Sequence, residues 1–494
     1  MNNIDAAFEA FLAPIANFIS SIVFFSVPVF GVQFPLIVAW LVVAGVFFTI
    51  YMRFLAWRGM KHAFDLVSGK YDRPNADGEV THFQALSTAL TNTLGLGNIA
   101  GVALAITLGG PGAVFWMVLA GCFAMATKMV ECTLGVKYRK VREDGTISGG
   151  PMYYLKRGFV EIGKPRLGNA LAYIYAVCMT IAFLGLMTFQ SNQAAAQVVN
   201  VTTGGVFEFL NGNRWLIGVF MAVLGALVIF GSVKKIAKAA SIMIPFMSAT
   251  YILSCITVIV VNFSALPEAI STIVAGAFNP QGVAGGFLGV LIIGFQRAAF
   301  SNAAGVGDAP VAHSVVKTDR PPTEGFVAAL EPFVDTICVN VVSALAVVVT
   351  GAYLVPGLSG VEITSAAFGT VAPWFTYVLA VAVFLFAFSA ILAFSYFGAK
   401  SLGFLFGDKN WIENIYKALM LLFTVIGTAV GLGAVVTLAD SMLFLMAVFN
   451  IIGLYFLAPI VRREFDDYWR RLKAGEFEAD RTDRKKPARK QPVA

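Results

Sequence analysis

The feature that most constrains this chain is a series of long apolar stretches, which follow one another from residue 34 to residue 461. A helix needs about 20 mostly apolar residues to cross the hydrocarbon core of a bilayer. Eleven stretches meet this requirement: Phe34–Phe54, Gln84–Leu108, Gly112–Gly135, Gly168–Val198, Trp215–Gly231, Ala240–Phe263, Gly286–Val306, Phe326–Ala352, Trp374–Lys400, Ile412–Gly433 and Ser441–Val461. They predict an all-α polytopic membrane protein with 11 transmembrane helices.

Composition excludes a soluble core of this size. The chain is 58% hydrophobic and 13% charged, and its 35 Lys and Arg and 28 Asp and Glu are too few to cover such a core. The formal net charge of +7 comes from short basic clusters between the apolar stretches and from the C-terminal end. That distribution is typical of a membrane protein, so we expect lipid and no nucleic acid as a partner.

The distribution of Lys and Arg also predicts an orientation. Basic residues concentrate in the loops after stretches one, three, five, seven and nine, and the alternate loops hold almost none. Because basic loops stay in the cytoplasm, we expect a multi-pass protein of the cell inner membrane with its N-terminus outside and its C-terminus cytoplasmic. Three regions follow: an interfacial segment over 1–33, a transmembrane domain over 34–461, and a charged cytoplasmic tail over 462–494.

The second apolar stretch is interrupted by Thr91-Asn92-Thr93-Leu94-Gly95-Leu96-Gly97-Asn98. Two glycines and two amides at the middle of a span indicate an unwound helix, although close helix packing is an alternative reason for the glycines. Unpaired backbone is tolerated there only where protein or a bound solute satisfies it. Freed carbonyl groups can bind sodium, and freed N–H groups at the start of a half-helix can bind a carboxylate.

The seventh stretch repeats this feature, with several glycines, Ser301 and Asn302 between Gly294 and Pro310. Two broken helices five spans apart predict a 5+5 inverted repeat, with repeat one at about 84–263, repeat two at about 286–461 and span one as an extra N-terminal helix. Such paired interruptions indicate the central binding site of a transporter.

Other polar residues within the apolar stretches are candidates for the same site. Gln190 continues an apolar stripe of the fourth stretch and is expected to face a cavity, whereas Ser389, in the ninth, could equally bond its own helix backbone. Lys128 and Glu131 are expected to form a local ion pair. Arg297, Asp308, Glu331 and Asp335 are compatible with gating pairs or with a proton site, and His62, His82 and His313 are expected at the membrane interface.

An enzyme is not expected. The chain has no His/Glu zinc motif and no nucleophile–base pair, and its five cysteines stand singly, without the spacing of a metal site or a disulfide framework.

Three motifs resemble those of the alanine or glycine:cation symporter family, also called sodium:alanine symporters. They are Gly109-Gly110-Pro111-Gly112-Ala113-Val114-Phe115-Trp116-Met117, Gly149-Gly150-Pro151-Met152-Tyr153-Tyr154-Leu155 and Phe300-Ser301-Asn302-Ala303-Ala304-Gly305. The likeness covers nearly the whole chain. It implies the inverted-repeat fold of the amino acid/polyamine/organocation superfamily.

By the same resemblance, substrate contacts would come from the broken helix at Gly95, Leu96, Gly97 and Asn98 and from Gln190, Phe295 and Ser389. Sodium ligands would come from Thr91, Thr93, Leu94, Asn98 and Ser389. Two positions depart from the family pattern: Leu96 stands where Thr is common, and Ala303 where Glu is common.

The resulting prediction is a secondary transporter that carries a small neutral amino acid, alanine or glycine, by alternating access. Sodium is the expected coupling ion, a proton is possible, and no organic cofactor is expected. The alternatives are a membrane channel and a proton-coupled transporter for a small solute.

Overall fold

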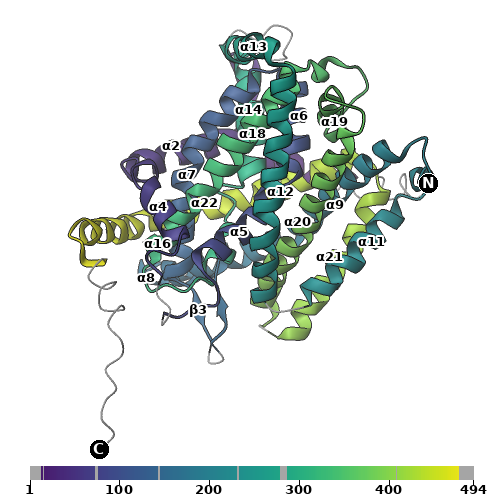
Figure 1. Cartoon of the computed structure of the whole chain (residues 1–494). Helices are drawn as coiled ribbons and strands as arrows, with labels where there is room; N and C mark the ends of the chain where they lie inside the picture. Colours follow the sequence, from purple (N-terminus) through teal and green to yellow (C-terminus); the bar gives the residue numbers. More distant parts are fainter. Residues whose placement is uncertain are drawn as a thin grey trace, which may run out of the picture.

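The fold is a bundle of long helices that run side by side through most of the molecule (Figure 1). The computed structural model describes residues 13–477 except residue 15 and residues 73–75, 143–144, 231–232, 279–285 and 408. The long helices of the first half are α2 (Leu36–Tyr51), α5 (His82–Thr93), α6 (Leu96–Gly109), α7 (Ala113–Lys137), α9 (Pro165–Thr202), α11 (Trp215–Ile229) and α12 (Val233–Val261).

The second half contains α14 (Gly286–Asn302), a composite span and three further long helices. The composite span consists of α16 (Pro321–Ala328), α17 (Leu330–Pro332), the π-helical turn η2 (Phe333–Val339) and α18 (Asn340–Val349). The others are α20 (Phe375–Phe406), α21 (Asn410–Ala429) and α22 (Leu432–Lys473). A π-turn inside a helix often marks a functional position.

Short elements connect these helices. The helical ones are α3 (Leu55–Arg58), α4 (Met60–Val67), α8 (Pro151–Glu161), α10 (Phe209–Gly212), η1 (Phe263–Ala265), α13 (Leu266–Phe278), α15 (Ala309–His313), η3 (Ala352–Leu354) and α19 (Val361–Gly369). Two antiparallel hairpins complete the described chain: β1 (Ser26–Val29) with β2 (Val32–Pro35), and β3 (Lys140–Val141) with β4 (Ile147–Ser148).

The structure confirms an all-α membrane architecture, since each of the eleven apolar stretches coincides with helix. In the described part of the chain, seven helices are long and apolar enough to cross a membrane, or eight if α5 and α6 count as one bent span. α2, α11 and the segment Phe263–Phe278 are shorter apolar helices. The number of eleven spans therefore stays a prediction.

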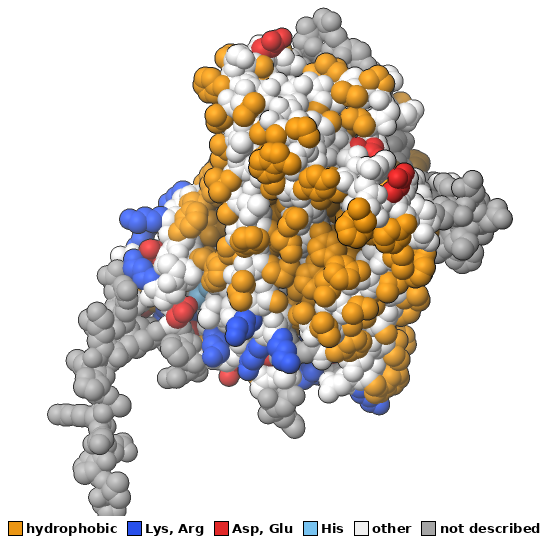
Figure 2. Space-filling model, turned by 45° about the vertical axis from the view of Figure 1, so that its right-hand side comes forward, with side chains coloured by type: hydrophobic (Ala, Val, Ile, Leu, Met, Phe, Trp, Pro, Cys, Tyr) orange, Lys and Arg blue, Asp and Glu red, His pale blue; other side chains and the backbone are white. Residues whose placement is uncertain are grey.

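The surface agrees with a lipid environment. Large apolar side chains are exposed along the outer helices, for example Leu227 of α11 and Ile242 and Phe246 of α12. Figure 2 shows such side chains over most of one side of the bundle, whereas Lys and Arg gather at its lower end, where β3 lies in Figure 1. An apolar side with basic residues at one end is the pattern of a protein that spans a bilayer.

The N-terminal segment differs in part from the expectation. Residues 1–12 lie outside the described residues, and the chain that follows makes a short helix and then the β1–β2 hairpin. The apolar pattern of this segment did not predict the hairpin, whose tip residues Phe30 and Gly31 both have positive φ angles. At the other end, α22 passes without interruption through residue 461 to Lys473, and residues 478–494 lie outside the described residues.

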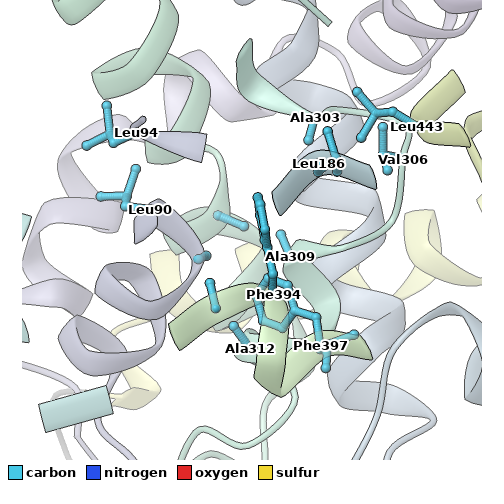
Figure 3. Packing of buried hydrophobic residues seen from close by; sticks show 14 of the residues in the cluster. Leu90, Leu94, Leu186, Ala303, Val306, Ala309, Ala312, Phe394, Phe397 and Leu443 are labelled. Atoms are coloured by element: carbon cyan, nitrogen blue, oxygen red, sulfur yellow. The ribbon is translucent and has the colours of Figure 1, made fainter. Parts of the chain in front are cut away.

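The interior is held together by close helix contacts around α9, which packs against α20, α21 and α22. Figure 3 shows Leu90 of α5, Leu94 directly after it, Leu186 of α9, Phe394 and Phe397 of α20 and Leu443 of α22 in one apolar cluster with residues of the segment Ala303–Ala312. Helices approach this closely where a small residue lies at the contact.

One such contact predicts a stability effect. A Cβ atom at Gly427 of α21 would lie 2.2 Å from Ser191 Oγ and 2.6 Å from Thr188 Cα of α9, so Gly427→Ala must push the two helices apart. We expect it to lower the free energy of unfolding by about 1–3 kcal/mol, the usual cost of overpacking. The thermal unfolding midpoint of the detergent-solubilised protein measures this effect. Gly212→Ala is the control, because a Cβ there meets nothing within 4 Å; equal midpoints for the two variants would contradict the packing argument.

Candidate functional site

The first break lies between α5 and α6, whose axes are bent by 40°. α5 begins with a capping box between Thr81 and Gln84 and ends at Thr93, where Leu94 adopts an extended conformation. The carbonyl groups of its last turn lose their helical partners, and the Thr93 hydroxyl is buried without a hydrogen-bond partner. The end of α5 therefore offers oxygen atoms in the interior of the bundle.

The start of α6 offers N–H groups at the same place. The Gly95 N–H donates to Asn98 Oδ1 at 2.9 Å, and the Leu96 N–H donates to Gln190 Oε1 of α9 at 3.2 Å. The positive end of a helix dipole attracts negative charge. The oxygen of Gln190 thus occupies a position that favours an anionic group, and the role expected for Gln190 as a substrate contact stays a prediction.

The second break follows α14. The chain leaves the helix at Asn302, reverses through Ala303, Gly305 and Gly307, which all have positive φ angles, and enters α15 at Ala309. Tyr175 of α9 and Asn450 of α22 hold this loop by donating to the carbonyl groups of Val306 at 2.9 Å and Gly305 at 2.8 Å. Both expected helix breaks are therefore present, and packing from other helices fixes the second.

The two breaks meet at Gly97. A Cβ atom there would lie 3.4 Å from the Cα of Ser301 and 3.7 Å from the ring of Phe300. The ring of Phe300 packs edge-on against Phe189 of α9, with centroids 5.5 Å apart. The residues from Thr93 to Ala100 are all buried. Glycine at position 97 allows α6 and the end of α14 to approach closely in a space closed to solvent.

A polar cluster joins the two breaks to η2 and α18. The Asn98 Nδ2 atom lies 2.6 Å from Asp335 Oδ1, 3.2 Å from the Asp335 carbonyl oxygen, 2.9 Å from Asn340 Oδ1 and 3.2 Å from Ser301 Oγ. Ser301 and Thr336 donate to Asp335 Oδ2 at 2.8 and 2.7 Å. All five side chains are buried.

The nitrogen of Asn98 is surrounded by more oxygen atoms than it has hydrogen atoms to donate. A side-chain amide has two N–H donors, whereas four oxygen atoms surround the Asn98 nitrogen within 3.2 Å. Within the described chain, no Lys, Arg or His lies within 4 Å of the Asp335 carboxylate. A buried carboxylate is costly unless a cation compensates it, so the cluster has the composition of a site for a small cation.

Two other candidate residues bond to their own helices, and a third borders a separate cavity. The hydroxyl groups of Thr91 and Ser389 donate to carbonyl groups of their own helices, Thr88 at 2.6 Å and Phe386 at 2.8 Å. Phe295 lies on α14 against Trp116 and borders a cavity of about 30 Å³ between α2, α7 and α14. The structure thus brings Phe300 against Gly97, and it places Phe295 beside Trp116.

The sequence analysis missed the grouping of Ser301, Asp335 and Asn340 with Asn98. The signal for Asp335 was present, because an ionisable group inside an apolar span indicates function. Ser301 belonged to the motif after Phe300, whereas Asn340 gave no separate signal.

One expectation about charged residues was wrong. The Lys128 ammonium contacts Asp308 at 3.1 Å and Glu331 at 3.3 Å, and Glu131 accepts a hydrogen bond from Asn450. The three histidines (His62, His82 and His313) are buried within the protein, and their expected position at the membrane interface stays a prediction. Local spacing suggested the Lys128–Glu131 pair, but the fold supplies closer carboxylates from elements far along the chain.

A further buried ion pair lies on the other side of Phe300. Arg297 of α14 donates to Asp440 of α22 at 2.5 Å, and its guanidinium carbon lies 5.4 Å from the centre of the Phe300 ring. Arg297 Nε and Asp440 Oδ1 are buried without partners. The pair therefore links α14 to α22 beside the aromatic wall of the site.

Two broken helices that meet at a closed polar site inside a membrane bundle define a secondary transporter. A solved structure with this architecture, MhsT in complex with L-phenylalanine, aligns with a TM-score of 0.55 and 15% identity over 78% of this chain and 98% of that one. This likeness shows the fold. The chain belongs to the sodium:alanine symporter family, whose model matches residues 18–482. It is thus a membrane transporter of the symporter type and not an enzyme.

Its relatives include transporters named for different amino acids. The sodium/alanine symporter AgcS of Methanococcus maripaludis is 35% identical over 87% of this chain and 93% of that protein. The amino-acid carrier protein AlsT of Bacillus subtilis is 34% identical over 87% and 89%. The probable sodium/glutamine symporter GlnT of the same organism is 33% identical over 89% of both chains.

The Arg297–Asp440 pair yields a prediction about how strongly the two side chains stabilise each other. Replacing one partner leaves a buried charge without compensation, which typically costs about 3–5 kcal/mol, whereas replacing both partners removes the charges together. We expect Arg297→Met and Asp440→Leu each to lower the thermal unfolding midpoint, and the double variant to recover part of the loss. Purely additive losses would show that the two side chains do not stabilise each other.

Proposed function

We propose that this protein is a sodium-coupled symporter of a small neutral amino acid in a cell inner membrane. The observation that carries this proposal is the group of oxygen atoms around Asn98, beside a carboxylate without a cationic partner. The basic end of the bundle in Figure 2 corresponds to the cytoplasmic side under the positive-inside rule. That assignment places the N-terminus outside and the C-terminus in the cytoplasm.

The coupling ion would bind among Asn98, Ser301, Asp335 and Asn340. Hard cations prefer oxygen ligands, and this cluster supplies carboxylate, amide, hydroxyl and carbonyl oxygen from four separate elements. A rotation of the Asn98 amide would turn its oxygen toward the ion. Cation binding would then fasten α6 to α14, η2 and α18, so the ion would stabilise one arrangement of the bundle over another.

A second sodium ion would use the end of α5. The carbonyl groups of Thr91 and Leu94 and the unpartnered hydroxyl of Thr93 are the candidate ligands there, with Ser389 as the candidate from α20. This site has weaker support than the Asn98 cluster, because the Ser389 hydroxyl bonds its own helix.

The amino acid would lie between the start of α6 and the ring of Phe300. Its carboxylate would face the N–H groups near Gly95 and Gly97, where Gln190 now contributes an oxygen. Leu96 and Phe300 would border the side chain, and the narrow space at Gly97 favours alanine or glycine. A relative named for glutamine makes the substrate side chain the least constrained part of this proposal.

Transport of the two solutes together would follow alternating access. The site is closed to solvent in this structure, and the Arg297–Asp440 pair beside Phe300 is placed to open and close one path to it. The two halves of the bundle would then move relative to each other to expose the solutes on the opposite side.

An uptake assay tests the proposed function. Proteoliposomes are given radiolabelled alanine, glycine or glutamine with an inward sodium gradient or with an inward proton gradient of equal size. We expect accumulation of alanine and glycine above the external concentration with sodium. Equilibration without accumulation would indicate a channel, and accumulation with protons alone would contradict sodium coupling.

Two isosteric or small replacements test the cation site. Asn98→Ala removes the central amide and Asp335→Asn removes the buried charge, so we expect both to abolish sodium-dependent accumulation while the protein inserts and folds. Because Asp335→Asn also removes a desolvation cost, its thermal unfolding midpoint without sodium should equal or exceed that of the natural chain. The matched control is Glu413→Gln, which neutralises a mostly buried carboxylate that pairs with Lys400 outside the cluster. Normal sodium dependence in the Asp335 variant would overturn the site assignment.

A further inference from the structure

A series of buried ionisable side chains connects the N-terminal end of α5 with the second helix break. Beginning at α5, His82 Nδ1 contacts Glu324 Oε1 of α16, and Glu324 Oε2 contacts His313 Nδ1 of α15 at 2.5 Å. His313 Nε2 lies 2.8 Å from Glu331 Oε1 of α17. Glu331 and Asp308 share the ammonium of Lys128, and Asp308 accepts from the amide of Asn92 at the end of α5.

The ionisable side chains of this series are almost completely buried. Lys128, Asp308, His313, Glu324 and Glu331 are 0% exposed and His82 is 2% exposed. Neither ion binding nor substrate binding, as proposed above, uses these groups. Buried charges of this number need an internal balance, because each uncompensated charge is costly.

The hydrogen bonds determine where protons must be. Both ring nitrogens of His313 face carboxyl groups, so when Glu324 and Glu331 are ionised both nitrogens carry a proton and the ring is a cation. His82 needs a proton on Nδ1 to donate to Glu324. When His82 Nε2 also carries a proton, three cations balance three carboxylates; when it does not, the series has a net charge of −1. The protonation of one atom, His82 Nε2, therefore decides the balance.

That atom has a route to solvent. His82 Nε2 lies 3.9 Å from Asp72 Oδ1, and the Asp72 side chain is 42% exposed. The loop that precedes α5 lies next to the β3–β4 hairpin, since Arg139 bonds the carbonyl group of Asp77 and Ile147 bonds Glu79. A proton can thus enter from the end of the bundle where β3 lies, through Asp72, and reach the buried series at His82.

The other charged groups near this path can be identified by element. His82 is acted on by Glu324 of α16, Asp72 of the preceding loop, His313 of α15 and His62 of α4. Arg139 acts on Glu324, and Lys128, Glu131 and Cys132 of α7 act on Glu331. Among these groups, His82 is the histidine with one ring nitrogen bonded to a buried carboxylate and the other directed toward a partly exposed one.

We propose that His82 Nε2 is a proton-binding site that controls whether α5 is held against α16. With the proton bound, a charged imidazolium attracts the Glu324 carboxylate; without it, a neutral ring still donates its Nδ1 proton to Glu324, but the attraction between opposite charges is lost. Acid therefore holds the first half of the broken helix in place, and raising the pH releases it. This inference rests on the proposed alternating access, in which α5 must move. The proton acts on the helix and is not itself carried.

A direct test uses the natural chain. Hydrogen–deuterium exchange of the α5 amides is measured at about pH 6 and about pH 8, which bracket the usual histidine pKa of about 6.5, and is corrected for the intrinsic effect of pH on exchange. We expect several-fold faster corrected exchange in α5 at the higher pH. α6 supplies an internal reference, since no hydrogen bond or ion pair joins it to these groups among the described residues. Equal protection of α5 at both pH values would overturn the proposal.

Matched variants test the residue assignment. His82→Asn keeps an N–H donor near the position of Nδ1 but cannot titrate, and Glu324→Gln removes the charge that attracts it. We expect both to make α5 protection and the rate of sodium-dependent alanine exchange independent of pH. His62→Gln is the control: burial lowers the pKa of His62 to about 4, and its Nε2 contacts Tyr468 at 2.8 Å outside the series.

The outcomes separate the two proposals. If the His82 and Glu324 variants keep the pH profile of the natural chain, or if His62→Gln loses it, the proton site is wrong. If the natural chain shows no sodium-dependent amino-acid binding at any pH but α5 protection still follows His82, the transport proposal fails and the proton site stands. Should His82→Asn fail to fold, Glu324→Gln and the exchange measurement on the natural chain still decide the question.

Discussion

The side chain of Asn98 joins the parts on which the rest of this structure depends. Its oxygen accepts from the Gly95 N–H at the start of α6, while its nitrogen contacts Ser301, Asp335 and Asn340. Irregular backbone inside a membrane must be satisfied by protein, and here one amide both caps a half-helix and closes the polar cluster. The helix break and the candidate cation site therefore depend on the same side chain, and a change at Asn98 alters both.

Much of this arrangement could be predicted from sequence. Apolar length located the spans, and glycines beside amides located both breaks, because these signals are local. Which face of α14 lies against the site could not be predicted from local sequence. Phe295 and Phe300 are five residues apart, which at about 100° per residue puts them on different faces of the helix. Only packing against α6 and α7 decides that Phe300 meets Gly97 while Phe295 meets Trp116. Likewise, Lys128 pairs with Asp308 and not with the neighbouring Glu131 because the fold brings α15 to α7.

Buried carboxylates are treated in two different ways. Asp308 and Glu331 are compensated by Lys128, so their charge balance is complete within the protein. Asp335 receives hydrogen bonds from Asn98, Ser301 and Thr336 instead, and these leave its charge without a counterion. Electrostatics therefore favours Asp335 as the place where an external cation adds stability. A cation beside Asp308 would have to compete with the ammonium of Lys128.

In the mechanism proposed above, the two ends of the broken span respond to different ions. α6 is fixed through Asn98 to the candidate sodium site, whereas α5 is fixed through His82 to Glu324 of α16. An unbroken helix would transmit any displacement at His82 directly to Asn98, since a helix is rigid over this length. The extended residues Leu94 and Gly95 interrupt that transmission. In the proposed mechanism, the break would therefore do more than expose backbone groups to a substrate: it would allow α5 to leave its contact with α16 while α6 keeps the cation and the amino acid in place.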